Sequence, residues 1–144
     1  MGNPFTVSLV CWHDGEPLLK SVREAVSRHE QSDAEKQMWD GQDESCRHAL
    51  VLSHGGDAIG CGRLLNNGQI GCIAVMPQWR EQHVGTAILE SLINHAHAHN
   101  YPQVEVEAQT SALPFYHAFG FTEQGEVFMK DGQPHVRMTK LLSG

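Results

Sequence analysis

The sequence lacks a long hydrophobic run, a cluster of basic residues and any closely spaced pair of cysteines. No apolar stretch approaches the roughly 20 residues that a transmembrane helix needs, so we expect no membrane partner. The chain starts without the basic and long apolar segments of a secretory signal, which favours a cytoplasmic location. Lysine and arginine number 10 against 17 aspartates and glutamates, and the net charge of −7 argues against nucleic acid as the main partner.

Patterns of metal-ligating residues are also scarce. The four cysteines form no CxxC pair, and their wide spacing predicts buried, reduced thiols and not a zinc site. His95, His97 and His99 alternate near the end of a predicted helix, where residues i and i+2 point to different faces. We therefore expect no metal site.

The chain has an ordinary globular balance, with 144 residues of which 40% are hydrophobic and 19% charged. This length predicts one domain over residues 1–144. Apolar periodicity and turn signals predict strands at residues 5–12, 49–53, 58–65, 69–75, 104–109, 122–129 and 135–141. Helices are expected at residues 18–29, 84–100 and 112–119, with a short additional one from Ser32. The resulting order, β-α-α-β-β-β-α-β-α-β-β, predicts an α/β fold with a mixed sheet and helices on both faces.

The most specific stretch is residues 69–87, where an apolar strand, a turn through Met76-Pro77 and the start of an amphipathic helix follow one another. A helix N-terminus presents unpaired N–H groups and the positive end of the helix dipole, so it can hold an anion such as a pyrophosphate. Gly85 and Ala87 leave room for a ligand to approach the backbone closely.

This stretch resembles motif A of the GCN5-related N-acetyltransferase (GNAT) family, whose pattern is Arg/Gln-x-x-Gly-x-Gly/Ala. Gln82, Gly85 and Ala87 fill the pattern, and the family often has glycine where this chain has Glu81 and His83. The resemblance implies that acetyl-CoA binds here and that the fourth and fifth strands splay apart, so that pantetheine pairs with the backbone of residues 72–75. The cofactor contacts implied in this region are Arg80, Gln82, His83, Val84, Gly85, Thr86 and Ala87 from the loop, with Ile73, Ala74 and Val75 from the strand.

A second stretch, ALPFYHAFGF at residues 112–121, resembles motif B of the same family, A-x-x-F-Y-x-x-x-G-F. The resemblance implies that Tyr116 projects toward the CoA sulfur. A phenol can protonate a departing thiolate, because its pKa of about 10 lies above that of a thiol. Tyr116 could instead only pack or position CoA. Phe115 and Gln109 are the remaining cofactor contacts that the resemblance implies.

The C-terminal segment resembles the ElaA-like and glyphosate-acetyltransferase-like branches, which have G-F-x-x-x-G-x-x-[FY] followed by P-H-x-x-M. In the second branch the histidine that matches His135 is the general base, and a histidine titrates in the range that this role needs. Glu107 on the fifth strand and His48 before the second strand remain rival bases. The residues that could pair with a substrate carboxylate are Arg23, Arg63 and Arg137.

Together the two motifs imply an acetyl-CoA-dependent N-acetyltransferase that acts on a primary amine, most simply of a small molecule, by direct transfer. A backbone N–H near Val75 would stabilise the oxyanion. Two alternatives stay open: a CoA-binding sensor module without turnover, and an enzyme that uses a different acyl-CoA. Dimers are common in the family, and the C-terminal strands are a plausible contact for a homodimer.

Overall fold

The computed structural model describes residues 5–30, 43–79, 82–130 and 132–142. The short helix expected from Ser32 and the cofactor contact expected at Arg80 lie outside these residues. The strands are β1 (Phe5–Cys11), β2 (Arg47–Ser53), β3 (Ala58–Leu64), β4 (Ile70–Val75), β5 (Gln103–Gln109), β6 (Thr122–Lys130) and β7 (Gln133–Leu141). The helices are α1 (Trp12–Glu30), α3 (Val84–Ala98) and α4 (Leu113–Ala118), with 3-10 turns at Asp43–Ser45, Pro77–Trp79 and Thr110–Ala112.

The strands form two antiparallel sheets, one in the order β1-β2-β3-β4 and one in the order β5-β7-β6. A parallel bridge between Gln69 and Glu105 joins them at the start of β4, and the Glu105 N–H donates to the Gly68 carbonyl at 3.0 Å. Gly68 has φ +93°, and a Cβ there would lie 2.5 Å from the Gln103 oxygen, so this close approach needs glycine. Beyond the bridge, β4 and β5 belong to separate sheets, which confirms the predicted splay.

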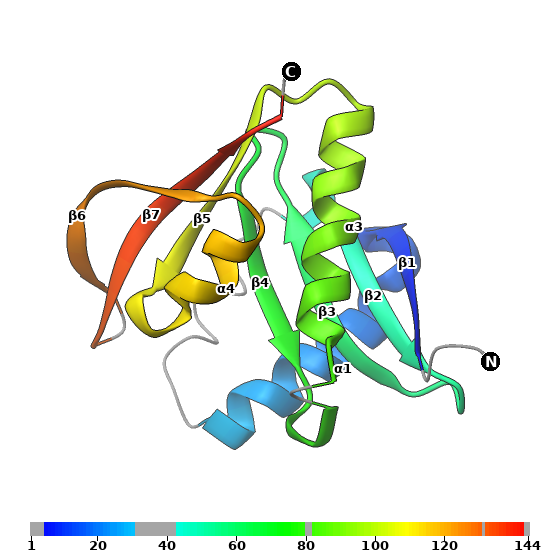
Figure 1. Ribbon diagram of the computed structural model, residues 1–144. Coiled ribbons are helices and arrows are strands. Elements are labelled where there is room, and N and C mark those ends of the chain that lie inside the picture. The colour runs from blue at the N-terminus through cyan, green and yellow to red at the C-terminus, as the bar shows by residue number, and fades with distance from the viewer. Residues whose placement is uncertain (1–4, 31–42, 80–81, 131, 143–144) are drawn as a thin grey trace.

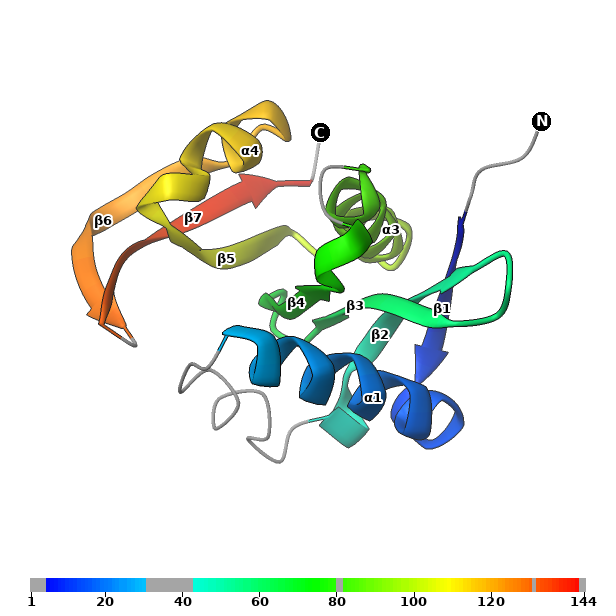
Figure 2. The same ribbon diagram turned by 90° about the horizontal axis from the view of Figure 1, so that it is seen from below.

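Helices cover both faces of the four-stranded sheet, as the sequence predicted. Helix α1 lies against one face and α3 against the other, while α4 covers the second sheet on the same side as α3 (Figures 1 and 2). The buried stripe of the amphipathic helix α3 consists of Val84, Ile88, Leu89, Leu92, Ile93 and Ala96. These residues join both sheets in the main hydrophobic core.

Helix α3 rests directly on the backbone of β3. A Cβ at Gly62 would lie 2.7 Å from Ile88 Cγ2, and one at Gly60 would lie 2.9 Å from Val84 Cγ1. Glycine at both positions allows this close packing, since a side chain would push the helix outward. The contact places the N-terminus of α3 beside the end of β4.

Helix α1 begins earlier than the sequence predicted. The apolar stripe indicated a start at Leu18, but the helix starts at Trp12 and includes Pro17. The Trp12 ring is 8% exposed and lies 5.3 Å from the His48 ring in β2. Burial of a large aromatic side chain therefore holds the first turns in place despite the missing proline N–H.

Candidate active site

The turn between β4 and α3 presents the start of the helix to solvent. His83 is the N-cap residue and has φ 68° and ψ 18°, in the left-handed region that favours glycine. The first hydrogen bond of the helix runs from the Ala87 N–H to the His83 carbonyl at 3.0 Å. The N–H groups of the residues between them have no partner within the helix, as at any α-helix start, so they can bind an anion.

A cavity of about 310 Å³ opens at this helix start, and we call it the loop cavity. It is lined by Val75, Trp79, His83, Val84, Gly85, Thr86 and Phe115. A Cβ on Gly85 would meet only Phe115 Cζ, at 4.0 Å, so the backbone of the first helical turn is open to the cavity. Backbone N–H groups beside aromatic side chains fit a ligand that has both an anionic group and an apolar arm.

All residues that line the loop cavity except Trp79 are among the cofactor contacts that the family resemblance implied. This residue belongs to the 3-10 turn and packs edge-on against Phe5, with ring centroids 6.4 Å apart. Three other predicted contacts lie elsewhere. Gln82 is exposed and donates to the Gln78 carbonyl at 3.1 Å, Ala74 is buried beneath α1, and Ala87 packs against the main core.

A second cavity of about 270 Å³ lies where β4 and β5 separate, and we call it the splay cavity. It is lined by Ile70, Gly71, Ile73, Val106, Glu107, Gln109, Ala112, Tyr116 and His135. Both predicted catalytic residues, Tyr116 and His135, thus line one cavity together with the predicted contacts Ile73 and Gln109. Phe115 and Tyr116 are neighbours on α4, and each lines one of the two cavities.

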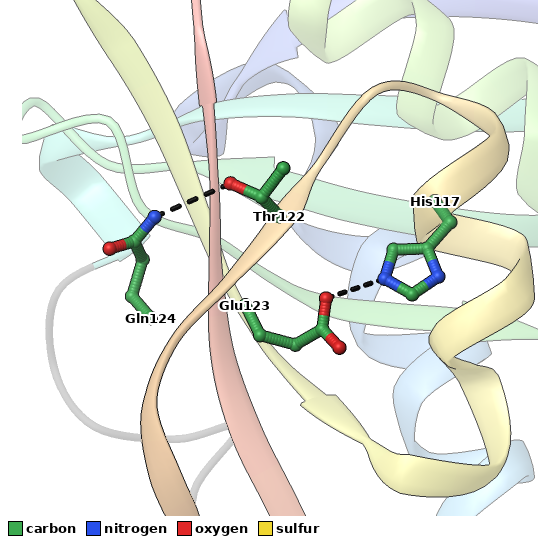
Figure 3. Close-up of polar contacts among 4 residues, drawn as sticks. All are labelled: His117, Thr122, Glu123 and Gln124. Atoms are coloured by element: carbon green, nitrogen blue, oxygen red, sulfur yellow. Dashed lines mark hydrogen bonds and ion pairs between the residues drawn. The ribbon is translucent and has the colours of Figure 1, made fainter.

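Tyr116 is suited to donate a proton. Burial raises the pKa of its phenol above the usual 10.0, so the hydroxyl keeps its proton at neutral pH. Its ring packs edge-on against Phe115 and Phe121, at 5.1 and 5.7 Å between centroids. A hydrogen bond joins helix α4 to β6: His117 Nε2 donates to Glu123 Oε1 at 2.5 Å (Figure 3). Next to it, within β6, Gln124 Nε2 donates to Thr122 Oγ1 at 3.3 Å.

His135 is suited to accept a proton. It lies in β7 opposite Gln109 and is 7% exposed, with its ring 6.1 Å from the Phe128 ring. Its Nδ1 lies 2.9 Å from the Gln133 carbonyl, which can only accept, so Nδ1 carries the proton of this bond. In the neutral imidazole the lone pair therefore resides on Nε2.

The rival bases have other surroundings. Glu107 lines the splay cavity but forms an ion pair with Lys130, a residue that the sequence did not single out. Its carboxylate is thus already paired with a cation of the protein. His48 is completely buried within β2, in the core and away from any surface that a substrate could reach.

The three arginines considered for a substrate carboxylate differ in position. Arg23 and Arg63 are 1% and 5% exposed, and the Arg23 guanidinium lies 5.2 Å from the Trp12 ring centroid. Arg137 is exposed on β7, with Nη1 3.7 Å from Glu105 Oε1. Only Arg137 among them is open to a ligand.

A third cavity is larger, at about 700 Å³. It lies next to the splay cavity, on the face of the second sheet that carries Glu107 and His135. It is lined by Gln103, Glu105, Gly120, Thr122, Gln124, Arg137, Thr139, Lys140 and Leu141. Along this face, Glu105 is followed by Glu107 on β5, and Arg137 lies next to His135 on β7. A polar surface thus extends away from His135.

The described ranges contain no group of three or more histidine, cysteine, aspartate or glutamate side chains arranged to hold a metal ion. None of the helices in the same ranges combines the length and apolarity that crossing a bilayer requires.

Comparison with known proteins points to one family. The family model described as "Acetyltransferase (GNAT) domain" matches residues 16–142. The uncharacterized protein YyaT of Bacillus subtilis is 30% identical over 128 residues, which cover 85% of this chain and 86% of that protein.

Solved structures agree with this match. The crystal structure of Escherichia coli ElaA superposes with a TM-score of 0.81 at 25% identity, covering 94% of this chain and 99% of that one. A GNAT family acetyltransferase from Elizabethkingia anophelis, solved with acetyl-CoA bound, gives a TM-score of 0.73 at 18% identity, covering 98% of this chain and 100% of that one. The family that the motifs predicted is thereby confirmed: the chain belongs to the GNAT family and is an N-acetyltransferase.

Proposed function

We propose that residues 1–144 form one domain that transfers an acetyl group from acetyl-CoA directly to the primary amine of a small molecule. The observation that carries this proposal is the pair of cavities on either side of Phe115 and Tyr116. One cavity lies at the start of α3 and the other at the splay of β4 and β5. The first suits the phosphates of CoA and the second suits the reacting ends of the two substrates.

Acetyl-CoA would span the two cavities. The N–H groups at the start of α3 bind the pyrophosphate, and the backbone of residues 72–75 pairs with the pantetheine amides as an added strand would. The acetyl-CoA in the Elizabethkingia relative supports this choice of donor. The thioester then lies in the splay cavity, beside Tyr116.

The reaction needs one base, one acid and one oxyanion donor. His135 Nε2 takes a proton from the acceptor ammonium, and the neutral amine attacks the acetyl carbonyl carbon. A backbone N–H near Val75 stabilises the oxyanion that develops. As the carbon–sulfur bond breaks, the Tyr116 phenol gives its proton to the leaving thiolate. The nitrogen of the new amide then gives its second proton to the Tyr116 phenolate, and His135 releases its proton to solvent. His135 and Tyr116 line the same cavity, so both residues can serve one bound acceptor.

A screen of primary amines with detection of the free thiol tests this function. Tyr116→Phe and His135→Gln should each lower kcat by about 10²-fold or more, the low end for a positioned acid or base. Both variants should still bind acetyl-CoA, because neither residue lines the loop cavity. A kcat that is unchanged in both variants would remove these assignments. Wild-type protein that binds acetyl-CoA but releases no thiol with any amine would be a sensor module.

We also propose a cytoplasmic enzyme that forms a homodimer through its C-terminal strands. Strand β6 is an edge strand of the second sheet and is exposed over most of its length. Val127 and Met129 on it are 58% and 67% exposed. Such an edge with apolar side chains can pair with a second copy. Light scattering should give the mass of a dimer, which Met129→Lys should reduce to that of a monomer.

A further inference from the structure

The side chain of Lys130 brings an amine to a carboxylate of the splay cavity. Its Nζ is paired with the Glu107 carboxylate, which lines that cavity together with Tyr116 and His135. The two side chains are 32% and 31% exposed, so the pair is half-buried at the rim. An ammonium of the protein is therefore bound to a carboxylate that lines this cavity.

The strand order brings this amine over His135. Strand β7 lies between β5 and β6, so an ion pair from Lys130 on β6 to Glu107 on β5 must cross β7. Register places Phe128 opposite His135, and Lys130 opposite Gln133, whose carbonyl accepts the His135 Nδ1–H. The amine, the carboxylate and the base thus share one face of the sheet.

We infer that Lys130 is an acetyl acceptor of the protein itself, a site of self-acetylation in the splay cavity. The inference rests on the proposed function, because the donor is the acetyl-CoA of that reaction. The lysine stem is flexible and its ammonium is a compact charge, so Nζ can leave Glu107 and turn into the cavity without backbone movement.

Acetyl transfer to Lys130 follows the same proton and bond changes as transfer to a free amine. His135 Nε2 takes one proton from the Lys130 ammonium, and the Nζ lone pair forms a bond to the acetyl carbon. The carbon–sulfur bond breaks, and its electrons leave with the sulfur, which takes the Tyr116 proton. The bonded nitrogen then gives its second proton to the Tyr116 phenolate, which restores the phenol, and His135 releases its proton to solvent. The product is a neutral amide that cannot pair with Glu107, so the carboxylate becomes available to an acceptor ammonium.

Incubation of the full chain with acetyl-CoA and no added amine, followed by peptide mass spectrometry, tests the site. Lys20 in α1 is the internal reference, since its side chain is 45% exposed and its Nζ lies 3.6 Å from Glu16. Uncatalysed acetylation should favour this more exposed lysine. Acetylation of Lys130 should instead be faster by on the order of tenfold or more, because the site holds amine and thioester together. Its rate should not depend on protein concentration.

Two variants separate catalysis from simple reactivity. His135→Gln should slow acetylation of Lys130 by about 10²-fold and leave Lys20 unchanged. Lys20→Arg, the matched control, should leave the rate at Lys130 unchanged. Equal rates at the two lysines, no acetylation at Lys130, or a rate at Lys130 that is unaffected by His135→Gln would each overturn the inference.

The amine screen distinguishes this failure from failure of the proposed function. Transfer to an added amine with none to Lys130 would overturn the self-acetylation alone. Transfer to neither would overturn both proposals. Transfer to Lys130 that depends on His135 would support both the site and the chemistry.

Discussion

Replacing Gly85 by alanine should stabilise the fold and weaken the binding of acetyl-CoA at the same time. Gly85 lies in the first turn of α3, where an added Cβ would meet only Phe115 Cζ, at 4.0 Å. Alanine is preferred over glycine in a helix by about 0.5–1 kcal/mol, because less backbone entropy is lost on folding. For a chain of this size the gain corresponds to a rise in Tm of about 2–4 °C.

The same methyl group would occupy the loop cavity of about 310 Å³. Extra volume in a fitted site costs about 1–3 kcal/mol, which weakens Kd by about 5- to 150-fold. Calorimetric titration with acetyl-CoA and a thermal unfolding curve give the two quantities on the same sample. Gly85→Ala should raise Tm and lower the affinity for acetyl-CoA, whereas general damage to the fold would lower both Tm and affinity.

Gly55→Ala is the matched control. A Cβ on Gly55 would lie 3.8 Å from Ser53 Oγ and 3.9 Å from Asp57 Oδ2, and this turn lines none of the three cavities described above. Its Kd for acetyl-CoA should equal that of the wild type. An unchanged Kd for Gly85→Ala would refute the assignment of the CoA phosphates to the start of α3.

Three further predictions concern backbone strain and pH. His83→Gly should raise the free energy of unfolding by about 0.5–1 kcal/mol, because the strain of a non-glycine residue in the left-handed region exceeds the extra backbone entropy that glycine loses on folding. A thermal unfolding curve measures this change. The pKa of His95 lies below the usual 6.5, mainly because of burial and also because of the nearby His99 and Arg47. The unfolded chain therefore binds more protons than the folded one, and stability is lost as the pH falls below about 6.5. Urea denaturation at several pH values should show a smaller loss in His95→Gln. Because burial raises the pKa of Tyr116, the alkaline fall in kcat should lie above pH 10.0 and disappear in Tyr116→Phe.

The short-range patterns predicted most of the fold, and many of the residues that line the two candidate cavities are among the site residues that the motifs implied. In β5, the apolar residues Val104, Val106 and Ala108 alternate with Glu105 and Glu107, and the structure buries the first set while the two glutamates stay partly exposed. Motif spacing indicated the residues at the start of α3 and on α4. These features depend on neighbours in the chain, which a sequence displays directly.

Features that depend on distant contacts were not predictable. The pair between Lys130 and Glu107 exists because β7 inserts between β5 and β6, and no spacing along the chain encodes that insertion. Arg23 and His48 looked available to a substrate, yet packing around Trp12 buries both. Tertiary packing decides which polar side chains remain accessible, so sequence reasoning offered more candidate residues than the site uses.

The most direct test of CoA binding is calorimetric titration of the folded protein with acetyl-CoA and, separately, with NAD and ATP. We predict micromolar binding of acetyl-CoA and no binding of the other two, because a CoA thioester has both a pyrophosphate for the start of α3 and a pantetheine arm for the splay cavity. Absence of acetyl-CoA binding to folded protein would contradict this prediction, and the start of α3 would then be an ordinary helix N-terminus.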